Sequence, residues 1–279
     1  MGGAKAERTT FPNAATRFAF GDNWASYAAL VDEERLVEAE RGLVRLLGPD
    51  GLRGRTMLDI GCGSGLHAAA AGRLGAARIV AVDLDSWSVE TTRAVLTRHA
   101  PLVSSEVRQA DVFDLDPATA GHFDVVYSWG VLHHTGAMGE AIGRAAAMVA
   151  PGGLFAFALY RRTRLCGVWR REKRWYAAAR PSAQAMARRI YVALLRAKFA
   201  MTGGDFRTYV ANYKSARGMD FRHDVHDWMG GYPYESISPA EVDDRMRNLG
   251  FEHVRSFTQT PSLGLFGSGC DEYVYRRSR

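Results

Sequence analysis

The chain has 279 residues, of which 47% are hydrophobic, and a formal net charge of +6 at pH 7. That length is enough for one large core, no apolar run approaches the roughly 18 residues of a membrane span, and the N-terminus lacks the apolar region of a secretory signal. The three cysteines are widely spaced, so they predict neither a disulfide framework nor a metal site, and they favour a cytoplasmic protein.

The first 48 residues are predicted to form a lid followed by a helix. Residues 11–31 are too rich in aromatic side chains for a disordered tail, and they indicate either a flap packed on the domain or a lid over its binding site. The aromatic residues concerned are Phe11, Phe18, Phe20, Trp24 and Tyr27. From Glu33 to Leu47, leucine and valine recur at helical spacing, which predicts the helix.

A glycine-rich turn comes next, at residues 59–65, with the sequence D-I-G-C-G-S-G. It lies between a run typical of a buried strand, 55–58, and a helical run, 66–71. Glycine permits unusual dihedral angles and close approach of a ligand, and the helix N-terminus offers free N–H groups. The spacing differs from the G-x-G-x-x-G of dinucleotide sites, and the G-K-[ST] of a phosphate loop is absent. A glycine turn in an unrelated α/β domain is the alternative.

Strands and helices then alternate as far as residue 159. Further strands are predicted at 78–83, 107–112, 123–129 and 151–157, and helices at about 64–75, 86–99 and 137–150. Such alternation predicts a parallel sheet with helices on both faces and a ligand at the carboxyl ends of the strands. Asp83, at the end of the second strand, can accept both ribose hydroxyls of a nucleoside, whereas Asp85 is a competitor whose alternative role is a helix cap.

These features, in this order, resemble the class I S-adenosylmethionine-dependent methyltransferases, in particular a small-molecule, quinone-methylating branch. The resemblance rests on D-x-G-x-G-x-G at 59–65, on Asp83 and Asp111, on G-V-L-H-H at 130–134 and on P-G-G at 151–153. It implies an α/β fold with a doubly wound, seven-stranded, mostly parallel sheet whose last strand is antiparallel, an N-terminal helical lid, and a helical cap inserted after the fifth strand.

The resemblance also implies S-adenosylmethionine as the cofactor and S-adenosylhomocysteine as its product. The acid at the place of Asp111 contacts the adenine amino group in that family, and Cys62 is interpreted as a small filler of the turn. The implied cofactor contacts are Asp59, Gly61, Cys62, Gly63, Gly65, Asp83, Leu84, Asp111, Val112 and Trp129.

Residues 160–237 interrupt the alternation and are predicted to form a basic helical cap on a core of residues 49–159. Between residues 160 and 222 there are 16 Lys and Arg but only three Asp and Glu. Three interpretations of this basic segment are open. Its arginines form a solvated helix face, or they bind an anionic acceptor through their guanidinium groups. Alternatively the segment binds RNA, since aromatic residues that could stack on bases lie among the arginines. Residues 238–279 are predicted to complete the core with a helix that begins at the capping box Ser238-Pro239-Ala240-Glu241 and ends at Gly250, followed by strands at 251–258 and 273–276.

Candidate catalytic residues come from two places. His133 and His134 follow the fourth strand, beside the methyl position that the resemblance implies, and imidazole suits general-base work. Residues 223–235 are predicted to be a loop that closes over the strand ends, with Asp227, Tyr232 and Glu235 as acceptor contacts. Structural roles are the alternative for both groups. No metal is expected.

The expected function is S-adenosylmethionine-dependent methyl transfer to an oxygen, nitrogen or carbon atom of a small-molecule acceptor. That acceptor could be anionic or tethered to a carrier protein. Three alternatives stay open: an RNA methyltransferase that uses the basic insertion, a non-catalytic binding protein that keeps the cofactor site, and a non-methyl use of the cofactor. RNA is the less favoured partner because no separate RNA-binding module is visible. Fold and cofactor do not determine the acceptor, and no oligomeric state is predicted.

Overall fold

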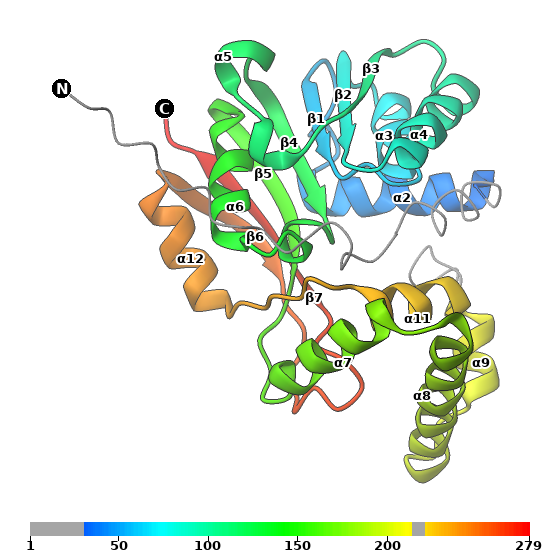
Figure 1. Cartoon of the computed structure of the whole chain (residues 1–279). Helices are drawn as coiled ribbons and strands as arrows, with labels where there is room; N and C mark the ends of the chain where they lie inside the picture. The colour runs from blue at the N-terminus through cyan, green and yellow to red at the C-terminus, as the bar shows by residue number, and fades with distance from the viewer. Residues whose placement is uncertain (1–30, 214–220) are drawn as a thin grey trace.

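A seven-stranded sheet with the strand order β3-β2-β1-β4-β5-β7-β6 runs through the centre of the computed structural model, which describes residues 31–213 and 221–279 (Figure 1). The first five strands are parallel to one another, and β7 is antiparallel to both of its neighbours. The strands are β1 Thr56–Ile60, β2 Arg78–Asp83, β3 Ser104–Gln109, β4 Phe123–Trp129, β5 Val149–Tyr160, β6 Phe251–Phe257 and β7 Cys270–Arg277. The predicted fold class is confirmed.

Helices cover both faces of this sheet because side chains along each strand alternate between the two faces. Met57 points into a cluster that contains residues of α2, α3 and α4, whereas its neighbour Leu58 points into a cluster that contains residues of α6 and α12. Figure 1 shows the same two layers. The core helices are α2 Glu33–Leu47, α3 Leu66–Arg73, α4 Ser86–His99, α5 Pro117–Ala120, α6 Met138–Ala147 and α12 Pro239–Asn248, with short 3-10 helices η2 Val112–Asp114 and η3 Leu132–His134.

The helix boundaries follow from capping side chains. Asp85 accepts a hydrogen bond from the backbone N–H of Ser88 and begins α4, so the capping role considered for it is present. Ser238 and Glu241 form the predicted capping box of α12. Helix α3 is shorter than predicted because Gly65 keeps a left-handed conformation, and α6 is shorter because β5 already begins at Val149.

The helices that the structure describes in the chain between β5 and α12 lie below the carboxyl end of β5 (Figure 1). They are α7 Cys166–Ala178, α8 Pro181–Met201, α9 Phe206–Ala211 and α11 Phe221–Gly230, called the insertion helices below. The expectation that residues 223–235 form a loop is wrong for its first part, because residues 223–230 belong to α11. The cause is the spacing of Val225 and Met229, which places both on one buried face of α11 against Tyr176.

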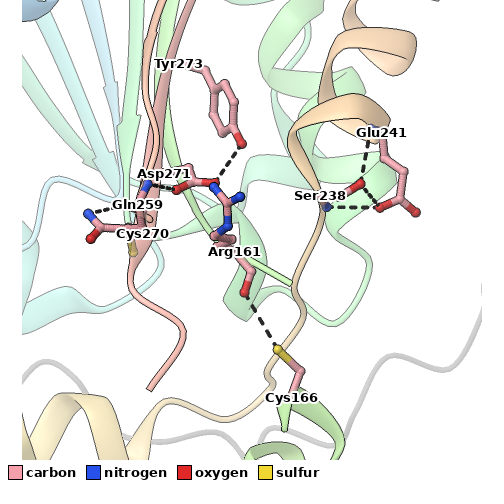
Figure 2. Close-up of polar contacts among 8 residues, drawn as sticks. All are labelled: Arg161, Cys166, Ser238, Glu241, Gln259, Cys270, Asp271 and Tyr273. Atoms are coloured by element: carbon pink, nitrogen blue, oxygen red, sulfur yellow. Dashed lines mark hydrogen bonds and ion pairs between the residues drawn. The ribbon is translucent and has the colours of Figure 1, made fainter. Parts of the chain in front are cut away.

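A buried carboxylate ties the start of the insertion to the sheet. Asp271 has no exposed surface, and it accepts hydrogen bonds from Arg161 at 3.1 Å, from the backbone of Gln259 at 2.7 Å and from the hydroxyl of Tyr273 at 3.2 Å (Figure 2). Arg161 also forms a β-bridge with Ile237. The insertion therefore leaves the sheet and returns to it at one place.

The aromatic lid predicted at 11–31 lies almost wholly outside the described residues. None of the helices described has the length and apolar composition needed to cross a membrane. Within residues 31–213 and 221–279, no group of three or more His, Cys, Asp or Glu could hold a metal ion.

Candidate active site

The glycine-rich turn joins β1 to α3 at the carboxyl edge of the sheet. Its three glycines, Gly61, Gly63 and Gly65, have φ angles of +77°, +53° and +76°, a region that side chains disfavour. A Cβ on Gly61 would lie 2.3 Å from a methyl group of Val131, and one on Gly65 would lie 2.8 Å from the Cα of α4 residue Thr92. The packing of the protein alone therefore requires glycine at positions 61 and 65, independently of any ligand that binds near the turn.

Asp83 fastens this turn to the end of β2. Its carboxylate accepts hydrogen bonds from the backbone N–H of Gly63 at 2.9 Å and from that of Asp85 at 3.0 Å. Burial raises the pKa of Asp83, although the backbone hydrogen bonds oppose that shift. The carboxylate predicted to bind a ribose is thus held beside the middle glycine of the turn.

Asp59 lies beneath the turn and is 2% exposed. Burial first, and the charge of Asp83 second, raise the pKa of its carboxyl group to about 7. Because the folded protein favours the protonated acid, this group contributes stability that is fully present below about pH 4 and is lost as the pH rises through about 7.

We therefore expect Asp59→Asn to be more thermally stable than the wild type at pH 8, with the difference disappearing towards pH 4. Thermal unfolding between pH 4 and pH 8 measures this. Asp50, whose side chain is 80% exposed, provides the control, since Asp50→Asn should follow the wild type at every pH. A constant difference between Asp59→Asn and the wild type would contradict the prediction.

The other predicted cofactor residues surround the turn but differ in their contacts. Cys62 is buried, its sulfur accepts from the hydroxyl of Thr92 at 3.3 Å, and burial raises its pKa, as suits a filler rather than a nucleophile. Leu84 follows Asp83 and is 47% exposed. Asp111 caps the short η2, in which Val112 is buried. The indole N–H of Trp129 donates to Glu272 at 3.0 Å.

After β4, His133 is fully buried and His134 is half-buried, and each ring has a structural contact. Nδ1 of His133 accepts from the backbone N–H of Tyr160 at 3.3 Å, and Nδ1 of His134 pairs with the carbonyl oxygen of Pro233 at 2.7 Å. Burial lowers the pKa of His133 well below its usual value and that of His134 to about 4. Both rings are therefore neutral at pH 7 and are weak proton acceptors.

The other three catalytic candidates lie on α11 and on the segment after it. Glu235 accepts from the backbone N–H of Met138 at 2.8 Å, which satisfies the N-terminus of α6. Its own backbone N–H donates to the carbonyl of His133, so this segment is joined to the end of β4. Asp227 is buried on α11, and Tyr232 is half-buried. The structure brings Glu235 and the two histidines together.

Lys173 was not among the residues predicted from the sequence. It has no exposed surface, and its ammonium nitrogen lies 3.6 Å from the centre of the Trp228 ring. Lys173 lies in a charged run, 170–174, in which no residue stands out as buried. The spacing of Trp169, Lys173 and Tyr176 is nevertheless helical and places all three on one face of α7. That spacing is the signal that would have found it.

A protein-family model described as a methyltransferase domain matches residues 31–198, which is more than half of the chain. The chain belongs to the methyltransferase domain family. The matched part of this methyltransferase domain contains the glycine-rich turn, Asp83, His133 and His134, and it extends into the insertion as far as α8.

Two curated relatives are similar over shorter stretches. The ubiquinone biosynthesis O-methyltransferase of Methylobacterium sp. (strain 4-46) is 34% identical over 118 residues, 42% of this chain and 45% of that protein. The ribosomal protein L11 methyltransferase of Thermotoga maritima is 41% identical over 81 residues, 27% of this chain and 26% of that protein. The matches thus span less than half the length of these relatives.

Among solved structures, the magnesium protoporphyrin IX methyltransferase of Synechocystis PCC 6803, with bound S-adenosylhomocysteine, has a similar fold. The TM-score is 0.53 at 13% sequence identity, and the match covers 88% of this chain and 84% of that one. At this identity the likeness concerns the fold alone.

Proposed function

We propose that this protein transfers the methyl group of S-adenosylmethionine to a small-molecule acceptor and releases S-adenosylhomocysteine. The observation that carries the proposal is the contact between Asp83 and the N–H of Gly63, which sets a carboxylate beside a left-handed glycine turn at the carboxyl edge of a parallel sheet. Membership of the methyltransferase domain family supports it.

The residues around the turn fit the chemical groups of this cofactor. Helix α3 begins without a side-chain cap, so its first N–H groups can receive the carboxylate of the amino-acid part. Asp83 can accept the ribose hydroxyls, and the exposed apolar side chain of Leu84 offers a surface to the flat adenine. We infer that Asp111 and Trp129 border the same site, as the resemblance implies.

Catalysis needs little beyond positioning, because the cofactor supplies an activated methyl group and a neutral leaving group. The protein must hold the acceptor in line with the methyl carbon, keep water away and remove the acceptor's proton where one is lost. The insertion helices lie beside the end of β5, from which they can cover the acceptor (Figure 1).

A small molecule is favoured over RNA by the packing of the aromatic residues in the insertion. Tyr176 is fully buried, the indole N–H of Trp169 donates to the carbonyl of Gly264, and the hydroxyl of Tyr191 donates to that of Phe266. These three residues are thus engaged within the protein, which leaves Trp175, 52% exposed, as the aromatic residue of α7 with a free face for stacking on a base. Two of the similar proteins also carry names of small-molecule methyltransferases, for ubiquinone biosynthesis and for magnesium protoporphyrin IX.

Calorimetric titration with S-adenosylhomocysteine tests the cofactor, and transfer of tritiated methyl groups to a panel of phenols and carboxylic acids tests the reaction. We expect saturable one-to-one binding and transfer to at least one member of the panel. Binding without transfer to small molecules, together with labelling of RNA, would favour the RNA alternative. Absence of binding by protein that is free of retained cofactor would refute the proposal.

A further inference from the structure

Lys173 lies inside an enclosure of three aromatic rings that come from three different segments. Its ammonium nitrogen is 3.6 Å from the ring centre of Trp228 on α11, 5.4 Å from that of Tyr234 and 5.9 Å from that of Tyr160 at the end of β5. We call Tyr160, Trp228 and Tyr234 the aromatic enclosure. Tyr160 and Trp228 are half-buried, so part of each ring-bearing side chain reaches the surface, whereas Lys173 between them has no exposed surface.

The nitrogen of Lys173 has no hydrogen-bond partner within residues 31–213 and 221–279. The ring face of Trp228 attracts a positive charge, but a buried ammonium group that makes no hydrogen bond is still unfavourable, so burial favours the neutral amine. Nε2 of His133 is likewise buried and without a partner in the described part of the chain. Unsatisfied buried polar groups of this kind call for a functional explanation.

Charged and titratable groups act on Lys173 from each element around it. Those that favour its charged form are Glu172 on the same helix, Asp224 and Asp227 on α11, and Cys270 on β7. After β4, His133 and His134 face it, and its positive charge lowers the pKa of both. Burial outweighs the acids and lowers the pKa of Lys173 to about 7, while burial of Glu172 raises the pKa of that carboxyl to about 7.

The aromatic enclosure is linked to the proposed cofactor site through the segment that follows β4. The ring of Tyr160 lies 3.9 Å from that of His133, centre to centre. His133 comes two residues after Val131, whose side chain packs against Gly61 of the glycine-rich turn. The unsatisfied amine and its three rings therefore lie on the side of the sheet where β4 and β5 end, the side that also carries the turn proposed to hold the cofactor.

We propose that Lys173 is the catalytic base of the methyl transfer and that it acts on the hydroxyl group of a planar acceptor bound against the aromatic enclosure. This inference rests on the proposed function. The rings of Tyr160, Trp228 and Tyr234 suit a flat acceptor, and the unsatisfied amine suits a group that gives up a proton.

The step balances without a further reactant. The acceptor's O–H bond breaks and its proton passes to the neutral amine of Lys173. The oxygen electron pair forms the new O–CH3 bond, and the CH3–S bond breaks with its electron pair on sulfur. The positive charge of the sulfonium thus ends as the ammonium charge of Lys173, which loses its proton to solvent before the next cycle.

Other candidates for the base are less suited. The pKa of His134 is lowered to about 4 and that of His133 falls well below its usual value, so neither holds a proton well at pH 7. Glu235 is engaged at the N-terminus of α6. A base works best when its pKa is near the working pH, and Glu172 and Lys173 both meet that condition. Lys173 is preferred because its nitrogen lies against the rings of the aromatic enclosure.

The test compares Lys173→Met with Lys198→Met. Methionine keeps the length of the side chain and suits an apolar site, so the variant should fold; thermal unfolding checks this. Lys198 is the matched control, an exposed lysine on α8 whose nitrogen lies 5.0 Å from a single ring, that of Phe266. Both variants should bind S-adenosylhomocysteine within threefold of the wild type.

The rate is measured as transfer of tritiated methyl groups to 3,4-dihydroxybenzoate between pH 6 and pH 9. We expect Lys173→Met to lose about 10²–10⁴-fold in kcat while Lys198→Met stays within threefold of the wild type. The wild-type rate should rise with pH through about 7, as the amine becomes neutral, and this rise should vanish in Lys173→Met.

The direction of the pH dependence separates a base from an anchor for an anionic acceptor. An anchor must be charged, so the wild-type rate would fall as the pH rises through about 7 and Lys173→Arg would remain active. That result, or a Lys173→Met variant within threefold of the wild type, would overturn the role of Lys173. Failure of the wild type to bind S-adenosylhomocysteine would instead refute the proposed function itself. The wild-type profile needs no variant, so it stands even if Lys173→Met fails to fold.

Discussion

Replacing Asp83 with alanine is expected to weaken the binding of S-adenosylhomocysteine by at least about 100-fold while the fold remains intact. Asp83 holds the N–H groups of Gly63 and Asp85, and we propose that it also accepts the ribose hydroxyls. Hydrogen bonds to a charged group contribute about 1.5–3 kcal/mol each, and about 2.7 kcal/mol corresponds to 100-fold in affinity. Calorimetric titration of the variant measures the loss directly.

Asp85 offers a matched control two residues away. It caps α4, so Asp85→Ala should lower the free energy of unfolding by about 1 kcal/mol. Because its carboxylate is directed at the N–H of Ser88, the affinity for S-adenosylhomocysteine should stay within threefold of the wild type. If the two variants bind equally well, Asp83 has no part in the cofactor site. If Asp85→Ala alone loses binding, the two acids have been assigned the wrong way round.

Elements that carry both a periodic apolar pattern and a capping side chain could be predicted from the sequence to the residue. Helix α2 has the predicted bounds because its leucines recur at helical spacing and Asp32 caps its N-terminus. Helix α4 also has the predicted bounds, because Asp85 caps its N-terminus. The parallel sheet follows from the alternation of such helices with short apolar strands, since few other topologies satisfy that order.

The predictions were wrong where charged residues interrupt the apolar spacing of a helix, or where a residue's contact lies far away in the sequence. Residues 223–230 were expected to be a loop because they are rich in titratable side chains and contain few apolar ones. The apolar pair Val225 and Met229 packs against Tyr176, about 50 residues earlier in the sequence. Lys173 was not predicted because it lies in a run of charged residues, where a buried lysine has the same local pattern as exposed ones. The roles of His134 and Glu235 depend on contacts with Pro233 and Met138, and local sequence says nothing about such distant pairs.

Replacing Asp271 with alanine is expected to lower the free energy of unfolding by about 3–5 kcal/mol, the range found when one member of a buried ion pair is removed. Asp271 has no exposed surface, and it satisfies Arg161, the backbone of Gln259 and the hydroxyl of Tyr273 at once (Figure 2). Alanine would leave the guanidinium of Arg161, which is only 16% exposed, without this partner. Denaturant unfolding measures the change.

The next arginine along the chain shows why burial, rather than the ion pair as such, should decide the effect. Arg162 pairs with Glu241 at 2.7 Å, closer than Arg161 lies to Asp271, but its side chain is 51% exposed and that of Glu241 is 45% exposed. Solvent screens such a pair, so Arg162→Ala should lower the free energy of unfolding by only about 1 kcal/mol or less. In the double variant Arg161→Met with Asp271→Leu, no buried charge remains unpaired, and much of the stability lost in Asp271→Ala should return. Equal losses in Asp271→Ala and Arg162→Ala would mean that water reaches Asp271, and that the end of β5 is held to β7 by its backbone alone.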